Sequence, residues 1–181
     1  MALGDEAVAA AVESGATEPE QLAETPFGEA LTNAGASMGE KILVRRIGRV
    51  SGEAVTEYMH RNNKDLPPQV GVLVATDAAG AEVARDVAMH IAAFTPAYLS
   101  RDEVPAELVD NERRIAQETA ENEGKPEKAI PKIVEGRLNG FYKENVLLDQ
   151  AFAKDPKKSV GQVVEEAGGT VTGFVRFRVG N

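Results

Sequence analysis

Cysteine is missing altogether from this chain of 181 residues, and several kinds of chemistry are excluded with it. Disulfide bonds, zinc–thiolate sites and cysteine nucleophiles cannot form, and such a composition is typical of proteins in a reducing compartment. Long apolar runs are missing too, because no stretch approaches the roughly 20 residues that a membrane-spanning helix needs. The first 15 residues contain Asp5, Glu6 and Glu13 but no basic residue, unlike a secretory or transit peptide. We therefore expect a cytoplasmic protein that has no membrane contact.

Basic residues are fewer than acidic ones: the chain has 20 Lys and Arg and 29 Asp and Glu, which gives a net charge of −9. Proteins that grip DNA or RNA obtain much of their affinity from basic surfaces that neutralise phosphates. Direct nucleic-acid binding is therefore not expected. An RNA- or ribosome-associated factor stays an alternative only if four arginines share one surface. These are Arg45, Arg49, Arg176 and Arg178.

Recognisable catalytic motifs are also absent. The glycines are dispersed, so there is no phosphate-binding GxGxxG or GxxxxGK[ST] loop, and no GxSxG nucleophile elbow occurs. The two histidines, His60 and His90, lie 30 residues apart on different predicted elements, a spacing that does not support a metal site. We predict no catalytic residue, no metal and no cofactor. A small hydrolase or isomerase with His60 or His90 as general base is the alternative, and it requires a nearby carboxylate in a concave pocket.

The residue pattern over the first 104 residues predicts helices followed by a small sheet. Short helices are expected within residues 1–38, around Asp5–Val12, Pro19–Leu22 and Phe27–Ala34, where prolines and glycines interrupt longer ones. Three strands with a β-branched, apolar character follow, and a helix of small apolar residues is expected from Gly80 to Phe94. The expected strands are Lys41–Val50, Glu53–His60 after a Ser51–Gly52 turn, and Gln69–Asp77, with Arg61–Pro68 as a loop.

The second half of the chain predicts a helical hairpin and a second strand–helix–strand unit. A helix is expected from Pro105 to a C-terminal cap at Gly124, and a second helix either starts at Pro131 or is kinked there. A strand over Glu144–Phe152, a helix over Lys157–Gly168 with Ser159 as N-cap, and a strand over Gly169–Gly180 complete the pattern.

The predicted fold class is therefore α+β. It consists of two small subdomains of antiparallel sheet packed with helices and a protruding antiparallel helical hairpin, or coiled coil. The expected domains are an N-terminal core subdomain, the hairpin and a C-terminal core subdomain, at residues 1–104, 105–143 and 144–181. Residue patterning leaves open whether the two core subdomains share one sheet.

His90 is the most informative polar residue of the predicted 80–94 helix. At 100° per residue it falls on the same stripe as Val83, Val87 and Phe94, so it lies on the apolar side of the helix. One interpretation is a buried histidine with its ring nitrogens bonded inside the core. The other is that this stripe is partly uncovered, so that His90 meets a ligand or partner.

The last predicted strand carries a second candidate contact. Strict alternation places Val171, Val175, Phe177 and Val179 on one face and Thr172, Phe174, Arg176 and Arg178 on the other. An aromatic residue flanked by arginine on an outer face is typical of a protein-contact patch. Packing of the same residues under a neighbouring helix is the alternative.

Four stretches together resemble one family, translation elongation factor Ts, in a form similar to actinobacterial members. The stretches "AMHIAA" and "KIVEGRLNGFY…LLDQAF" are specific, and the order and spacing of all four agree over about residues 38–180. They are Met38–Val50, Gly71–Pro105, Glu112–Asp155 and Ser159–Gly180. The resemblance implies two α+β subdomains and a coiled-coil hairpin. It also implies a guanine nucleotide exchange factor that promotes GDP release from elongation factor Tu by distorting its nucleotide and magnesium site.

The resemblance also implies partner-binding residues. The "AMHIAA" helix would press on the GTPase domain of elongation factor Tu, with His90 partly covered in the free protein, and the "VTGFVRF" strand belongs to the subdomain that grips the third domain. The implied contact residues are Met89, His90, Ala93, Val171, Thr172, Gly173 and Phe174.

Two features of the family are not found in these residues: its N-terminal three-helix domain and its "TDFVA"-type wedge. We therefore expect a fragment that binds GDP-bound and nucleotide-free elongation factor Tu but releases GDP poorly. A homodimer through the coiled coil is left open.

Overall fold

The structure is a computed structural model that describes residues 2–61, 63 and 65–179. The chain forms two compact units, residues 1–49 and 50–181, and each is described by itself. Helices and antiparallel strands occur together, so the predicted α+β class is confirmed. Among the described residues, no helix is both long enough and apolar enough to cross a membrane.

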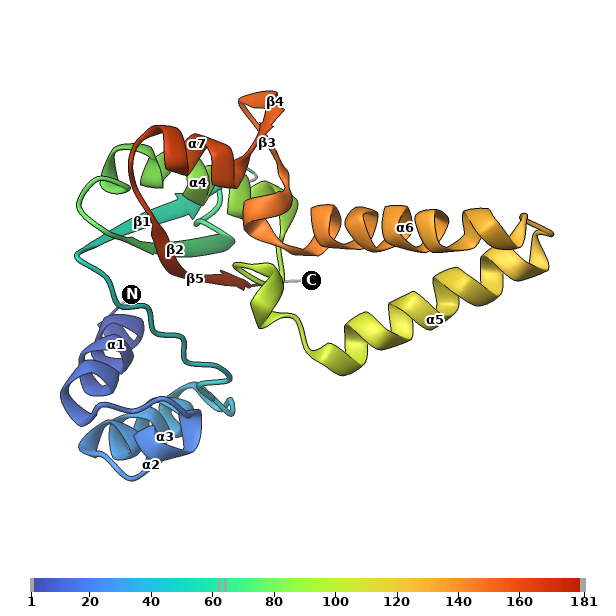
Figure 1. Cartoon of the computed structure of the whole chain (residues 1–181). Coiled ribbons are helices and arrows are strands. Elements are labelled where there is room, and N and C mark those ends of the chain that lie inside the picture. The colour runs from blue at the N-terminus through green and yellow to red at the C-terminus, as the bar shows by residue number, and fades with distance from the viewer. Residues whose placement is uncertain (1, 62, 64, 180–181) are drawn as a thin grey trace. The chain divides into compact units, whose positions relative to one another are not determined.

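Three short helices make up most of the first unit: α1 (Ala2–Ser14), α2 (Pro19–Ala23) and α3 (Pro26–Met38) (Figure 1). They confirm the three helices expected in this region. Proline stands at the first turn of both α2 and α3, where its missing N–H costs no hydrogen bond. A small core of Ala16, Leu22 and Phe27 holds the helices together.

The strand expected at Lys41–Val50 is wrong, because this segment has no regular structure and no strand partner. Val44 and Ile47 instead pack against the small helical core of the first unit. These β-branched residues pack against other side chains and do not belong to a strand. Strand pairing and burial both favour β-branched residues, so the sequence does not distinguish the two. The expected hairpin at Ser51–Gly52 is therefore wrong as well.

A three-stranded antiparallel sheet forms the centre of the second unit, in the order β1 (Ala54–His60), β2 (Val70–Thr76) and β5 (Val171–Arg178). The first two strands and the helix α4 (Ala81–Phe94) lie where the pattern predicts them. Helix α4 packs on one face of the sheet, over a core in which Val74, Val87 and Ile91 are fully buried. The third strand, however, comes from the far end of the chain. Residues expected in separate N- and C-terminal subdomains thus share one sheet.

A register shift in β5 changes which of its side chains face α4. Ala75 pairs with Gly173 but Thr76 pairs with Val171, so Thr172 is skipped. Val171 therefore lies in the same core as Phe174, and the strict alternation predicted for this strand is wrong at its first residues.

The predicted helical hairpin is present as α5 (Ala106–Asn122) and α6 (Ile130–Asn145), which pack against each other. The pair extends away from the sheet of the second unit, as Figure 1 shows. Gly124 has a φ of 68°, so the glycine expected at the end of α5 supplies the left-handed conformation that the turn requires. Pro131 lies in the first turn of α6, so the helix begins there without a kink. That the pair is a coiled coil stays a prediction.

The strand expected at Glu144–Phe152 is largely wrong. Helix α6 continues to Asn145, a short 3-10 turn η3 covers Leu147–Asp149, and only Ala151–Phe152 form a strand, β3. Val146, Leu147 and Phe152 of this run are buried, but the amide of Leu147 bonds to another loop, where it donates to the carbonyl of Tyr98 at 2.8 Å. The apolar composition of this run therefore reflects burial, and it does not require the run to form a paired strand.

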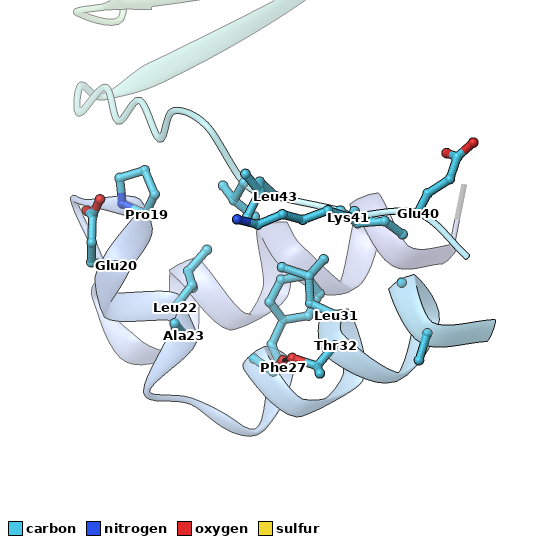
Figure 2. A pocket seen from close by; sticks show the side chains of 15 residues that line it. Pro19, Glu20, Leu22, Ala23, Phe27, Leu31, Thr32, Glu40, Lys41 and Leu43 are labelled. Atoms are coloured by element: carbon cyan, nitrogen blue, oxygen red, sulfur yellow. Dashed lines mark hydrogen bonds between the residues drawn. The ribbon is translucent and has the colours of Figure 1, made fainter. Parts of the chain in front are cut away.

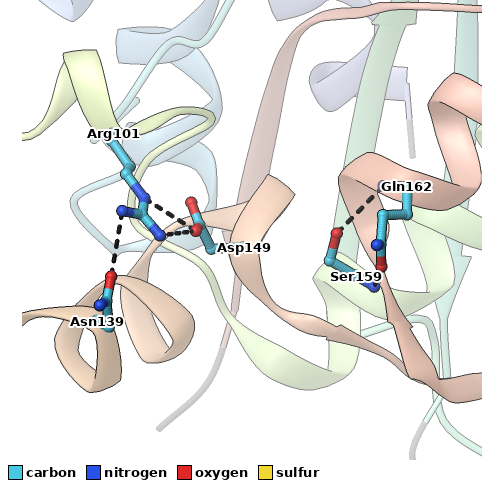
Figure 3. Close-up of polar contacts among 5 residues, drawn as sticks. All are labelled: Arg101, Asn139, Asp149, Ser159 and Gln162. Atoms are coloured by element: carbon cyan, nitrogen blue, oxygen red, sulfur yellow. Dashed lines mark hydrogen bonds and ion pairs between the residues drawn. The ribbon is translucent and has the colours of Figure 1, made fainter. Parts of the chain in front are cut away.

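Strand β3 pairs with β4 (Asp155–Ser159), and helix α7 (Val160–Glu166) follows. The helix expected over Lys157–Gly168 is therefore shorter than predicted, because its first residues belong to β4. The predicted N-cap of α7 is confirmed, because the Ser159 hydroxyl accepts from the Gln162 amide while the Gln162 side chain accepts from the Ser159 amide. This capping box is drawn in Figure 3.

Candidate functional site

Helix α4 has one buried side and one exposed stripe. The stripe contains Glu82, Arg85, Met89 and Ala93, spaced three or four residues apart so that they lie above one another on the helix. Of the residues predicted to contact a partner, Ala93 is exposed and Met89 is half-buried on this stripe. They are therefore available for contact without any rearrangement of the helix.

His90 lies outside this stripe, about 100° around the helix from Met89, and is completely buried, so the expectation of a partly exposed ring is wrong. Its Nε2 lies 2.8 Å from Oε1 of Gln150, and its Nδ1 accepts a hydrogen bond from the Ala153 N–H at 3.2 Å. The Gln150 amide in turn donates to the carbonyl of Glu144 at 2.8 Å. The interpretation of a bonded core histidine is the correct one.

These contacts fix the protonation state of His90. Because Nδ1 accepts from a backbone N–H, the proton must be on Nε2, which donates to Gln150 Oε1. Burial lowers the pKa of His90 below its ordinary value of 6.5, and the bond to Gln150 opposes this only in part. His90 is therefore held as a neutral ring that joins α4 to the segment after α6.

Phe94 reaches solvent in place of His90. Its ring stacks on the His90 ring with centroids 4.6 Å apart, and 51% of Phe94 is exposed. The centroid of the Phe152 ring lies 6.0 Å from that of the same imidazole. Sequence reasoning placed Phe94 on the stripe of His90 but did not predict that it would be the outer member of this stack.

The predicted contact residues of β5 are divided between core and surface. Thr172 is exposed, and its hydroxyl donates to the carbonyl of Ser51 at 3.1 Å. Val171 is buried, whereas Gly173 and Phe174 are half-buried. Phe174 packs against the core under α4, so the prediction of an outward aromatic patch is wrong and the packed alternative is correct.

Hydrogen bonds join the residues just before α4 to the residue just before β5, and a further bond joins β5 to the end of α4. At its start, Asp77 Oδ1 accepts from the amides of Gly80 at 2.8 Å and Thr170 at 3.0 Å, and these bonds lower the pKa of Asp77. At its end, Arg176 Nη2 donates to the carbonyl of Ala92 at 3.2 Å. The two segments predicted to bind a partner therefore form one body.

Arg101 forms a clamp that sequence reasoning missed. Figure 3 shows its guanidinium reaching Asp149 of η3 and Asn139 of α6, with Nε 2.9 Å from Asp149 Oδ1 and Nη1 3.3 Å from Asn139 Oδ1. The same group lies 4.5 Å from the centroid of the Tyr142 ring. The bond to Asp149 raises the pKa of Arg101. Nothing in the sequence connects these residues, because they come from three separate segments.

The described residues offer little to the hydrolase alternative. No group of three histidine, aspartate or glutamate side chains in that part of the chain could hold a metal ion. The partners of His90 are an amide oxygen and a backbone amide, and His60 Nδ1 lies 3.0 Å from the Tyr58 hydroxyl. Arg45 and Arg49 belong to the first unit and Arg176 and Arg178 to the second, so the shared surface required by the RNA alternative stays untested.

The first unit contains an apolar cavity of about 480 Å³, shown in Figure 2. Leu22, Phe27 and Leu31 line it from the helices, and Leu43 lines it from the irregular segment. No histidine borders this cavity, so it does not provide the catalytic pocket that the hydrolase alternative requires.

Comparison with known proteins identifies relatives over the whole length of the chain. The sequence model of the family described as Elongation factor TS matches residues 1–181. Elongation factor Ts of Beutenbergia cavernae is 59% identical over 185 residues, covering 99% of this chain and 66% of the relative. The protein of the same name from Micrococcus luteus is 57% identical over 189 residues, covering 100% of this chain and 68% of the relative. For that of Kocuria rhizophila, 62% identity extends over 86% of this chain and 56% of the relative. The chain thus spans about two thirds or less of the length of these relatives.

Proposed function

The chain belongs to the elongation factor Ts family, and we propose on this premise that it promotes release of GDP from elongation factor Tu. Elongation factor Tu, in both its GDP-bound and its nucleotide-free form, is the proposed partner, and the cytoplasm is the proposed compartment. No bond is made or broken in such an exchange, and no cofactor is required. The observation that carries the proposal is the high identity to named elongation factors Ts along nearly the whole chain.

Nucleotide exchange follows from linkage between two binding events. A protein that binds nucleotide-free elongation factor Tu more tightly than the GDP-bound form must weaken GDP binding by the same factor. It needs a surface that holds the partner and a body stiff enough to favour one conformation of it. The net charge of −9 would steer the chain toward basic regions of the partner and would act mainly on the association rate.

Two exposed places on the second unit are proposed as the contact surface. Met89 and Ala93 lie on the exposed stripe of α4, and Thr172 is exposed on β5. The bond between Arg176 and Ala92 holds the strand and the helix together, so the two contacts cannot move independently. A partner bound at both places would therefore contact a single rigid body.

The remaining predicted contact residues act from beneath that surface. His90 positions α4 through Gln150 and Ala153, and Val171 and Phe174 pack the strand against the helix. Gly173 lies beside the Val50 side chain, and a Cβ added there would make an ordinary contact at 3.9 Å. His90 is thus proposed as a positioning residue, whose substitution weakens partner binding through the helix and not through a lost contact.

The hairpin at residues 105–143 is proposed as a module that is separable from the segments 1–104 and 144–181, with coiled-coil packing. A homodimer through this hairpin stays a proposal that sedimentation of the free chain can test.

The decisive experiment measures linkage directly. Calorimetry gives the affinity of this chain for nucleotide-free and for GDP-bound elongation factor Tu, and stopped-flow fluorescence gives the rate of GDP release. We expect tighter binding of the nucleotide-free form and faster release, with a modest acceleration if other parts of the longer relatives contribute. Equal affinities together with an unchanged release rate would contradict the proposal.

A surface variant and a matched control locate the contact. Ala93→Arg places a long charged side chain on the exposed stripe of α4 and should weaken binding at least tenfold. Ala106→Arg makes the same change at an exposed position of α5 and should leave the affinity within twofold. Equal losses in both variants would remove α4 from the proposed contact surface.

A further inference from the structure

A groove of about 580 Å³ runs along one side of the α5–α6 hairpin, away from α4 and β5. Residues of both helices line it. From α5 these are Arg113, Gln117 and Glu121, and from the start of α6 and the turn before it Glu127, Ile130, Pro131, Val134, Glu135 and Leu138. The proposed exchange function does not use this groove, and the inference below does not depend on that function.

Small residues on α5 explain why the groove exists. The residues that α5 buries are Ala116 and Ala120, and α6 buries only Val134. Alanine side chains reach only a short distance from α5, so they do not cover the larger apolar side chains that lie beside them on α6. Ile130 and Leu138 are accordingly half-buried and Pro131 is exposed. The floor of the groove is apolar and reaches water.

The rim of the groove is acidic. Glu121, Glu127 and Glu135 border it, and among the described residues no ion pair is formed by Glu127 or Glu135. The one basic residue at the rim, Arg113, has its charge offset by Asp110, whose Oδ1 lies 2.6 Å from Nη1. A ligand of this groove would meet an apolar floor and unpaired carboxylates above it.

We propose that this groove binds a basic amphipathic helix of a partner protein. The lining residues of α5 are four apart, a spacing that keeps them on one face over about 12 Å, or roughly two turns of a helix lying alongside. A third helix in this position would complete a three-helix bundle and bury the half-exposed floor. Its apolar residues at i, i+3 or i+4 would contact Ile130, Val134 and Leu138, and flanking Lys or Arg would pair with the rim.

A second copy of this chain is a poorer occupant than a basic helix. Two hairpins packed groove to groove would bring the rim carboxylates of both copies together, and like charges facing each other oppose association. Charge complementarity therefore selects a basic partner.

The test uses two synthetic 14-residue helical peptides with the same leucine pattern, one with lysine and one with glutamate at all other positions. Fluorescence anisotropy at 150 mM salt measures their binding to the full chain. We expect the lysine peptide to bind with a Kd below 1 mM and the glutamate peptide not to bind. Hydrogen exchange should show protection by the lysine peptide within residues 113–138, because the groove lies there.

Charge-reversal pairs separate the groove from general attraction to an acidic protein. Glu127→Lys with Glu135→Lys should weaken the lysine peptide at least tenfold. Glu107→Lys with Glu165→Lys changes the net charge equally at exposed positions outside the groove and should leave the affinity within twofold. Equal weakening in both pairs, or protection elsewhere in the chain, would overturn the proposal. So would a dimer of the free chain, seen by sedimentation, that the groove pair abolishes, since the occupant would then be a second copy.

Discussion

Helix α4 and the hairpin α5–α6 belong to the same unit but are stabilised in different ways. Helix α4 buries six of its residues, and Ala84, Val87, Ala88, His90 and Ile91 are completely inaccessible to solvent. The longer helices of the hairpin bury three residues in total, and two of them are alanine. Apolar burial is worth about 25 cal/mol per Å², so the sheet region carries most of the hydrophobic stabilisation of this unit.

The hairpin depends on local interactions and on its root. Surface ion pairs such as Arg114–Glu118, at 2.8 Å, contribute about 0.3–0.5 kcal/mol each. At the root, the amides of Ala97 and Tyr98 donate to the carbonyl of Asn145, and Arg101, which precedes α5, bonds to Asn139 of α6 and Asp149 of η3. A change inside the sheet region should therefore affect the whole unit, whereas a change in the hairpin should stay local.

Replacing His90 should have the largest effect. His90→Ala removes a fully buried ring and leaves Gln150 Oε1 and the Ala153 N–H without their partners, so the free energy of unfolding should fall by about 3 kcal/mol. Urea unfolding followed by circular dichroism measures it. Met89→Ala on the exposed stripe of the same helix should cost less than about 1 kcal/mol. Equal effects of the two changes would break the distinction between the two sides of α4.

Removing the root clamp should have an intermediate effect. Arg101→Ala deletes the bonds to Asp149 and Asn139 and the contact with Tyr142, which we expect to cost about 1 kcal/mol, because the arginine is partly in solvent. Hydrogen exchange should become faster at the end of α6. Arg114→Ala, the same change on the outer surface of α5, should cost no more than about 0.5 kcal/mol and leave that exchange unchanged.

Acidification should weaken the sheet region through His90. Its pKa is lowered in the folded protein, so the unfolded chain binds a proton first as the pH falls. The contribution of the neutral ring to stability is complete above pH 6.5, the ordinary pKa of histidine, and is lost as the pH falls toward the lower pKa of His90 in the folded protein. Protonation of Nδ1 then breaks the hydrogen bond from the Ala153 N–H. Urea unfolding at pH 7.5 and 5.5 measures this. The difference should be smaller in His90→Gln, which has no titrating group at this position.

Deleting most of the hairpin should have the smallest effect on the rest of the unit. With Asn111–Leu138 replaced by a short Gly/Ser linker, the sheet should still unfold cooperatively, with a free energy changed by less than about 1 kcal/mol, because the deleted part contributes nothing to the core around Val74 and Ile91. Thermal unfolding checks this. A broad transition without cooperativity would show that the hairpin is part of that core and that residues 105–143 are not separable.

Local patterns predicted most of the helices and strands. The small residues and period of α4, the Pro–Gly boundaries of α5 and α6, and the Ser159 capping box are each determined by neighbouring residues, and each is found where expected. The two largest errors among the predicted elements are apolar runs. Lys41–Val50 and Glu144–Phe152 have strand-like composition. An apolar run indicates that a segment is buried, but a buried segment need not pair with another strand.

The candidate site was predicted in part for the same reason. The sequence alone placed His90 on the apolar side of its helix, because helical periodicity is a local property. Whether that side is covered depends on residues 60 positions away, and only the fold brought Gln150 and Ala153 against the ring. The pairing of β5 with β2, the shift that turns Val171 inward and the Arg101 clamp likewise join distant segments. Local geometry thus determined what each segment is, and tertiary packing decided what each one contacts, because contacts between distant segments leave no period in the sequence.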